Sequence, residues 1–487
     1  MEKTKLSQHI KKGDTLHTPF TGLLGEQLKL TSWSRDKLPQ YIWIAIILDF
    51  CGRDKGLNTL GLIMNDLEEN DICIAEMSEI LILDEKKQQK FYSVIDKYIP
   101  KHILSPLSLV FSSYECPWFF DHYCSPEIDI NQKIDRLNLV IKNTLYFHSN
   151  QATDICFIIN WFHVTNGRLI IAKGCNILAD ALSNYHNHSH NEEIMQKYRS
   201  SIRASVQGLG LRFEHDNSFS LKFWDKLAEI SSCVPMLIDF SKKAGKMKST
   251  FYKDICKVIE YIDVTSRDKI QTVKFSVIMG ITIYVVKLYS EIRKNKLDNT
   301  ISARIIFRTI IESYINLKYL MFKEPTQSDI YEMFQNYGIG KYKLVMAKIR
   351  EEKYSSNEFI HFDPKALEIY VNEFRSEEFQ EISLGFFDRG NIRNKFNLVN
   401  ESELYEIYYE YDTNFAHALW GSIRESAMLL CDNPAHLYHT VPDYTFEQEL
   451  ISINGDCEMV LKKLFHTISS FIELPDFYIK KYEVGQC

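Results

Sequence analysis

From Leu221 onward, apolar residues recur every three or four positions almost without interruption, which is the spacing of an amphipathic α-helix. The predicted helical runs span residues 221–241, 249–263, 266–294, 300–323, 327–351, 364–377, 401–431 and 446–472. Five prolines lie between these runs or in their first turns, where proline is tolerated: Pro325, Pro364, Pro434, Pro442 and Pro475. The pattern predicts a C-terminal bundle of helices.

The N-terminal half is less regular but also reads as helical. Residues 41–50 are apolar nearly all round, which predicts a buried helix. Residues 131–147 and 152–178 return to helical spacing, and the turn-rich stretch 207–220 looks like a connector. We therefore predict an all-α protein of two helical lobes, with an N-terminal lobe at residues 1–215 and a C-terminal bundle at residues 216–487.

One predicted helix, Ile301–Phe322, carries a stripe of charge although most of its residues are apolar. Arg304, Arg308 and Glu312 are spaced four residues apart and so share one side of a helix. Arg308 and Glu312 can pair across one turn. Enclosed charge is costly unless it is paired, so the stripe indicates either a structural network or a functional site.

A second charged face is predicted within residues 401–431. If this run is one helix, Glu406, Glu410, Thr413 and Arg424 all lie within roughly 40° of His417 around its axis. Two carboxylates, an imidazole and a guanidinium could perform acid–base chemistry near neutral pH. The same residues could also form the solvated face of an amphipathic helix.

Composition narrows the classes of protein. The net charge of −7 over 487 residues excludes a global basic footprint for nucleic acid. The most apolar run, Phe275–Val286, has 12 residues, whereas a membrane span needs about 20, so we predict a buried helix and no membrane partner. The N-terminus lacks an apolar signal core, and with 11 scattered cysteines this indicates the cytoplasm.

The motifs of P-loop NTPases, Rossmann enzymes, zincins and α/β-hydrolases are missing from the sequence.

The order of these motifs resembles a known family. Arg308-x3-Glu312 is followed by the tyrosine-bearing segment 331–342 and then by Thr413-x3-His417. This order is similar to a bacterial family of all-helical domains catalogued as domain of unknown function number 5677, whose members typically carry serine at the position of Thr413. The resemblance covers about residues 230–435 and implies a helical bundle, bacterial origin and proximity to mobile-element and phage-defence genes. It implies no established reaction, and the N-terminal half resembles no family.

Three functional hypotheses follow. In the first, the protein is a cytoplasmic anti-phage defence or toxin effector that acts on RNA or a nucleotide, with His417 as acid or base beside the remaining site residues Arg308, Glu312, Glu410 and Arg424. The arginines would bind phosphate. The Arg-x4–6-His spacing of helical ribonucleases of the HEPN class is missing, so such a site would be a variant.

In the second hypothesis, the protein is a non-catalytic defence component that binds a partner protein or nucleic acid. In the third, ranked last, His186, His188 and His190 hold a metal for hydrolysis. The predicted site itself includes no cofactor and no metal ligand. The many tyrosines would suit a homo-oligomer.

Overall fold

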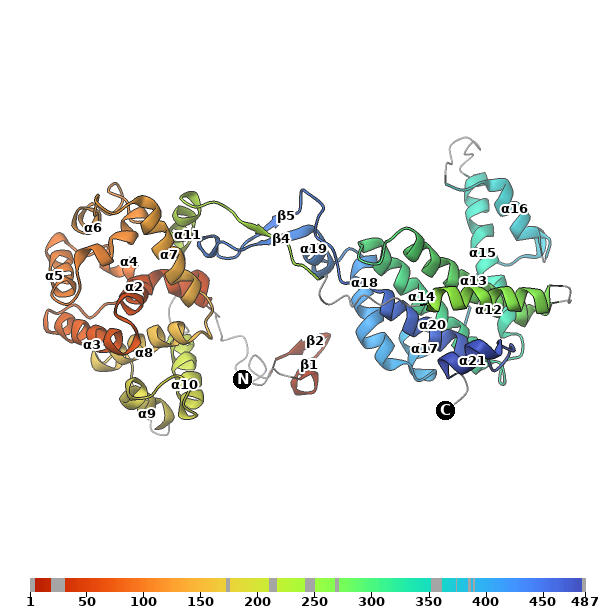
Figure 1. The fold of residues 1–487 in the computed structure, drawn as a ribbon, viewed down its shortest axis with the longest axis horizontal. Coiled ribbons are helices and arrows are strands. Elements are labelled where there is room, and N and C mark those ends of the chain that lie inside the picture. The colour runs from red at the N-terminus through yellow and green to blue at the C-terminus, as the bar shows by residue number, and fades with distance from the viewer. Residues whose placement is uncertain are drawn as a thin grey trace. The chain divides into compact units, whose positions relative to one another are not determined.

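The computed structural model describes residues 5–18, 31–171, 176–209, 217–240, 250–267, 271–351, 361–373, 375–383, 387–388 and 390–483. Most of these residues are helical, and the strands are few and short, so the predicted all-α class is confirmed (Figure 1). The chain forms two compact units. Unit 1 comprises residues 1–236 and 430–441, and unit 2 comprises residues 237–429 and 442–487. The predicted boundary between residues 215 and 216 lies outside the described residues and stays a prediction.

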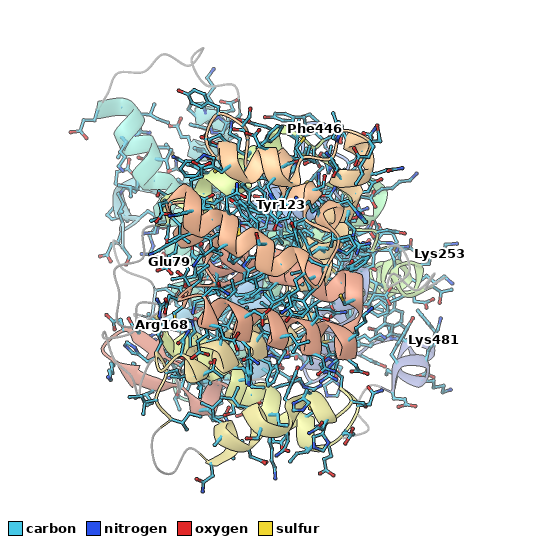
Figure 2. The ribbon with its side chains drawn as sticks, turned by 90° about the vertical axis from the view of Figure 1, so that its left-hand side faces the viewer. Glu79, Tyr123, Arg168, Lys253, Phe446 and Lys481 are labelled. Atoms are coloured by element: carbon cyan, nitrogen blue, oxygen red, sulfur yellow. The ribbon has the colours of Figure 1, made fainter. Side chains whose placement is uncertain are left out.

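Unit 1 is built around the apolar helix α2, Ile42–Cys51, which is buried along most of its length as its sequence predicts. Tyr123, 1% exposed, lies among the surrounding helices (Figure 2). The other α-helices of this unit are α3 (Arg53–Glu69), α4 (Met77–Ile80), α5 (Glu85–Asp96), α6 (Pro117–Tyr123), α7 (Ile130–Thr144), α8 (Asn150–Thr165), α9 (Asn176–Asn184), α10 (Ile194–Leu209) and α11 (Ser218–Glu229). Short 3-10 or π turns lie at Leu6–Gln8, Trp33–Lys37, Leu38–Tyr41, Lys101–Ile103, Ser105–Leu109, Tyr185–Asn187 and Pro434–His436.

Within the described part of the chain, five short strands accompany the helices. Strands β1 (Ile10–Lys12) and β2 (Thr15–His17) form an antiparallel hairpin. A three-stranded sheet has the order β3-β4-β5, with bounds Pro235–Met236, Met428–Cys431 and Thr440–Pro442. Strands β3 and β4 are antiparallel, and Pro235 lies opposite Cys431. Residues 235–236 and 428–431 were predicted to be helical, and these predictions are wrong.

Unit 2 packs around α14, Ile301–Lys323. This helix contacts α13, α15, α17, α18 and α20, and Phe307, Ile310 and Leu317 are buried beneath them. The helices of unit 2 are α12 (Phe251–Ser266), α13 (Val273–Lys294), α14, α15 (Ile330–Glu351), α16 (Pro364–Asn372), α17 (Ile392–Leu398), α18 (Glu410–Ala416), α19 (Trp420–Ala427), α20 (Asn454–Ile468) and α21 (Asp476–Tyr482), with a 3-10 turn at Glu377–Phe379. The central position of α14 explains why this helix is so apolar.

Within the described residues, helix α13 is long and apolar enough to cross a membrane by length and composition alone. Buried core helices of soluble proteins pass the same test. Ile278, Val285 and Ile292 of α13 are fully buried, and the helix packs against α14, α15 and α20. The apolar run at residues 275–286 is therefore part of the core of unit 2, and the helix continues beyond it at both ends.

The stretch predicted as one helix over residues 401–431 is not continuous. It consists of a π-helix at Leu404–Tyr409, α18, α19 and strand β4. Helix α18 ends because Ala418 adopts a left-handed backbone with φ of +49°. The Leu419 N–H donates to the Asn414 carbonyl, and the Ala418 N–H donates to the Phe415 carbonyl, which together form a Schellman motif. The usual sequence signal for this motif is glycine, and alanine replaces it here.

The alanine at this position predicts a stabilising substitution. A left-handed conformation strains any residue with a Cβ atom, so Ala418→Gly is expected to raise the free energy of unfolding by about 1 kcal/mol. Chemical denaturation measures this change. Ala416→Gly, inside α18, is the matched control and should lower stability by about the same amount. A destabilising Ala418→Gly would show that this turn is not left-handed in solution.

Candidate functional site

The predicted Arg308–Glu312 pair forms, and it belongs to a closed network between α14 and α18. The Arg308 guanidinium donates through Nη1 to Glu312 Oε2 (3.3 Å), through Nε to Thr413 Oγ1 (3.2 Å) and through Nη2 to Tyr409 Oη (2.5 Å). All three nitrogens therefore have partners. The guanidinium carbon also lies 4.6 Å from the centre of the Tyr409 ring, within cation–π range.

The partners of Arg308 are bonded to one another as well. The Tyr409 hydroxyl lies 3.3 Å from Glu312 Oε2, and Thr413 Oγ1 donates to the Tyr409 carbonyl at 2.6 Å. Burial and the neighbouring Glu312 carboxylate raise the pKa of Tyr409, so its hydroxyl keeps its proton. The network fixes the orientation of Arg308 and leaves Arg308 and Glu312 only partly exposed, with 23% and 33% of their side chains accessible.

One turn away, the same two helices enclose a second set of charges. Arg304 is 5% exposed, and its Nη2 donates to the Ile451 carbonyl, whereas its buried Nε has no hydrogen-bond partner among the described residues. Asp412 is 2% exposed, and its side chain has no hydrogen bond or ion pair among the described residues. Burial raises the pKa of Asp412 to about 7, although Arg304 acts in the opposite direction. Burial also raises the pKa of Asp456, at the start of α20.

These contacts define a continuous feature that we call the α14–α18 seam. It consists of Arg304, Arg308, Glu312, Tyr409, Asp412 and Thr413. Glu312 contacts Tyr409, whereas Arg308, one turn earlier on α14, also contacts Thr413, one turn later along the chain, so the two segments run antiparallel. The seam contains two arginines and a carboxyl group that titrates near neutral pH, a combination that is concentrated at functional sites.

A cavity of about 360 Å³ lies between α13, α14 and α15. Its lining residues are Val277, Gly280, Ile281, Tyr284, Ser313, Asn316, Phe334 and Gln335. Asn316 follows Glu312 by four residues, so it continues the Arg304–Arg308–Glu312 stripe by one more turn of α14. The stripe thus leads from the seam to an open cavity. The helical rise places Asn316 about 12 Å from Arg308 along the axis of α14.

The structure brings together only some of the residues that the sequence predicted for the site. Arg308, Glu312 and Thr413 meet, whereas His417 is exposed beyond the end of α18 and has no hydrogen bond to Arg308 or Glu312 among the described residues. The shared face of Glu410, His417 and Arg424 inferred from a single helix is interrupted before Arg424, because the chain turns at Ala418. Their catalytic roles stay predictions.

Glu410 and Arg424 also have positions that the single-helix prediction did not anticipate. Glu410 is exposed at the first position of α18. Arg424 lies on α19 and donates through Nη1 to the Met428 carbonyl at 3.0 Å. Sequence reasoning missed Tyr409, Asp412 and Asp456. The sequence signal for Asp412 as a site residue was its position one residue before Thr413. Its burial could not be predicted, because it depends on the packing of three helices.

Unit 1 contains a cavity of about 280 Å³, and the histidine loop lies beside it. Asp154 accepts hydrogen bonds from Tyr185 Oη (2.8 Å) and Arg53 Nε (3.2 Å), and it pairs with His190 Nε2 (3.1 Å). His188 Nδ1 pairs with Glu192 at 2.7 Å. The loop histidines are thus held by separate carboxylates, and they do not form a cluster of metal ligands among the described residues. The hypothesis of a metal held by the histidine loop, ranked last from the sequence, therefore gains no support from these contacts.

The comparisons with known proteins concern the region that contains the seam. The model of a family described as "Family of unknown function (DUF5677)" matches residues 275–436. The predicted resemblance of the C-terminal half is therefore confirmed, and the N-terminal half matches no family model. No curated protein and no solved structure matches the chain. The matched region includes all six residues of the seam and all the residues of the α13–α15 cavity.

Proposed function

We propose that the C-terminal unit is the effector of a bacterial, cytoplasmic anti-phage defence or toxin system and that it acts on RNA or a nucleotide. One observation carries the proposal. The stripe on α14 connects the half-exposed Arg308–Glu312 pair to the cavity at Asn316. A phosphate group needs a charged partner such as Arg308, and a nucleobase needs a cavity such as the one at Asn316. Helix α14 holds these two places at a fixed separation.

The chemistry of each end supports a nucleotide ligand. The planar guanidinium of Arg308 suits phosphate oxygens, and the network with Tyr409 and Thr413 orients it in advance. The cavity has the volume of a small-molecule site, with Tyr284 and Phe334 as aromatic surfaces. Ser313, Asn316 and Gln335 supply hydrogen-bonding groups of the kind that read base edges. The matched family is of unknown function, and the defence part of the proposal rests on the proximity to mobile-element and phage-defence genes that the sequence resemblance implies.

A second candidate function is favoured by one specific observation. All three guanidinium nitrogens of Arg308 already bond to protein atoms, which suits a purely structural network. The protein would then be a non-catalytic defence component that binds a partner protein or nucleic acid. In that case the seam would hold α14 against α18 and would not contact a substrate.

Substitution of Asn316 tests the first proposal, because this residue lines the cavity without belonging to the Arg308 network. With the full chain expressed in a bacterial host, Asn316→Ala is expected to reduce RNA loss or growth arrest by at least about 10-fold. The free energy of unfolding should fall by only about 1 kcal/mol, because Asn316 Oδ1 accepts one long hydrogen bond (3.4 Å) from the buried Lys395. Lys287→Ala, exposed on α13 outside the cavity, is the matched control and should leave activity unchanged.

Arg308→Lys then separates the two candidates. Lysine keeps the charge but cannot reproduce three hydrogen bonds, so both candidates predict some loss of stability. Only the nucleotide proposal predicts that activity and binding of purified protein to RNA or nucleoside triphosphates also fall. If RNA integrity, nucleotide levels and growth are the same with and without the wild-type chain, the effector proposal is wrong.

A further inference from the structure

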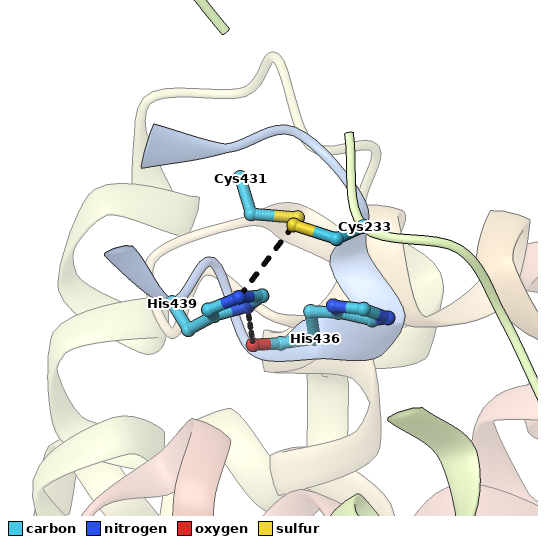
Figure 3. Close-up of side chains that lie close together, drawn as sticks. All are labelled: Cys233, Cys431, His436 and His439. Atoms are coloured by element: carbon cyan, nitrogen blue, oxygen red, sulfur yellow. Dashed lines mark hydrogen bonds between the residues drawn. The ribbon is translucent and has the colours of Figure 1, made fainter. Parts of the chain in front are cut away.

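Four metal-ligating side chains meet in unit 1, outside the seam. They are Cys233, Cys431, His436 and His439, and their ligand atoms all lie within 4.8 Å of one another (Figure 3). Cys233 follows α11, Cys431 ends β4, His436 ends the 3-10 turn Pro434–His436, and His439 lies just beyond it. This is the one such cluster among the described residues.

Backbone contacts hold the two segments of the cluster together. The Asp432 N–H donates to the Val234 carbonyl at 2.8 Å, and the Cys431 N–H donates to the His439 carbonyl at 2.9 Å. The Val234 N–H points at the Cys431 sulfur, 3.4 Å away. The cysteines are therefore positioned by main-chain bonds as well as by side-chain packing.

The turn between the two histidines is strained. Leu437 and Tyr438 both adopt left-handed backbone conformations, with φ of +54° and +49°. Two successive residues with Cβ atoms in this region cost free energy, and such strain persists where the surrounding structure imposes it. This turn reverses the direction of the chain, so His439 packs against His436 with the ring centres 4.9 Å apart.

Hydrogen bonds to the main chain leave one nitrogen available on each imidazole. His436 Nε2 lies 3.1 Å from the Ser231 carbonyl, to which it donates, so His436 Nδ1 is left as the lone-pair donor. His439 Nδ1 lies 3.3 Å from the His436 carbonyl, so His439 Nε2 is left available. Metal-bound histidines almost always donate their second N–H in this way. His439 Nε2 has no main-chain partner among the described residues and forms a weak hydrogen bond with Cys233 Sγ at 3.6 Å.

This separation matches a tetrahedral zinc centre. With Zn–S near 2.3 Å and Zn–N near 2.1 Å, a sulfur and a nitrogen ligand of one zinc lie about 3.5 Å apart. Two cysteines and two histidines are a common ligand set for structural zinc. A disulfide between Cys233 and Cys431 would account for the two sulfurs but not for two imidazoles that each place a ligand atom within 4.8 Å of both sulfurs.

We propose that Cys233, Cys431, His436 and His439 bind one Zn²⁺ ion as a closed structural site. All four positions of the tetrahedron come from protein, so the ion would have no open position for a substrate. It would fasten residues 430–441 to the end of α11, joining segments 206 residues apart within unit 1. This inference is independent of the function proposed for unit 2.

Metal analysis of the untagged full chain tests the proposal. The wild-type protein, purified without chelator, is expected to contain about one zinc per chain, as four-ligand sites do. Cobalt added to zinc-depleted protein should give the visible absorption of a tetrahedral cobalt–thiolate centre. Cys233→Ser should weaken metal binding at least about 10-fold and remove the sulfur-to-cobalt band in part, because Cys233 supplies one of the two thiolates.

Matched variants distinguish loss of a ligand from loss of fold. Cys73→Ser and His102→Ala change a cysteine and a histidine of unit 1 outside the cluster, and both should keep the metal. His439→Asn should lose it with unchanged far-ultraviolet circular dichroism. Wild-type protein without zinc and without the cobalt spectrum would overturn the proposal. So would zinc that stays fully bound in Cys233→Ser, or an intact mass that shows a Cys233–Cys431 disulfide.

Discussion

Asp412→Asn is expected to stabilise the protein at pH 8, by on the order of 4 kcal/mol. Asp412 is 2% exposed, and burial raises its pKa to about 7. The difference between this value and the ordinary value of about 3.9 corresponds to that free energy, at 1.36 kcal/mol for each pKa unit. Asparagine has nearly the same shape as the protonated acid and never becomes charged.

The sign of the effect depends on pH. Between about pH 4 and pH 7 the folded chain keeps a proton on Asp412 that the unfolded chain has lost, so stability falls as the pH rises through this window. Below about pH 4 the carboxyl group is neutral in both states and asparagine gives no advantage. The benefit of Asp412→Asn should therefore appear gradually from about pH 4 and level off above about pH 7.

Denaturant titrations from pH 4 to pH 8 measure this profile. Glu406→Gln is a suitable control, because it removes an exposed carboxylate close to the same helix and should change stability by less than about 0.5 kcal/mol at any pH. An Asp412→Asn variant that is less stable than the wild type at pH 8 would mean that the charged carboxylate is satisfied by Arg304 and that burial does not dominate.

Glu401→Ala is expected to have the opposite effect and to lower the free energy of unfolding by about 3 kcal/mol. Glu401 is 7% exposed and accepts hydrogen bonds from Tyr314 Oη (2.7 Å), Lys318 Nζ (2.7 Å) and Lys463 Nζ (2.8 Å). It joins α14 to α20 through one carboxylate. Its removal leaves the buried Tyr314 hydroxyl without this acceptor.

The contribution of Glu401 to stability also depends on pH in the opposite direction to that of Asp412. Burial acts to raise the pKa of Glu401, but the hydrogen bonds from Lys318, Lys463 and Tyr314 outweigh it, and the pKa is lowered. The stabilisation is therefore present above the pKa of the unfolded chain and is lost as the pH falls through the lower pKa of the folded chain. Glu403→Ala, exposed two residues along, is the control. Equal stability of the two variants at pH 7 would contradict a buried role for Glu401.

The helical class and part of the seam could be predicted because their signals are local. Apolar periodicity identified α14, and the four-residue spacing of Arg308 and Glu312 identified their pair. The end of α18 could not be found in this way, because Ala418 replaces the glycine that usually marks a left-handed turn. The consequence was a single predicted helix whose charged face was extended to Arg424, which lies on α19.

The remaining errors concern contacts between distant parts of the sequence. Asp412 looks like an ordinary polar residue of an amphipathic helix, and only the packing of α14 and α20 around it makes it a buried acid. Cys233 is isolated in the sequence, and 206 residues separate it from His439. Neither pattern nor spacing connects such positions, so the zinc ligands and the titrating carboxyl group emerge only from the fold.

The division of unit 1 into two stretches of chain also has a consequence for synthesis. Residues 430–441 belong to unit 1 but are translated after most of unit 2. The ribosome therefore releases an N-terminal unit that lacks its last strand and three of the four proposed zinc ligands until nearly the whole chain has emerged. A chain that terminates early, before residue 430, would carry an incomplete first unit, which would leave it open to proteolysis.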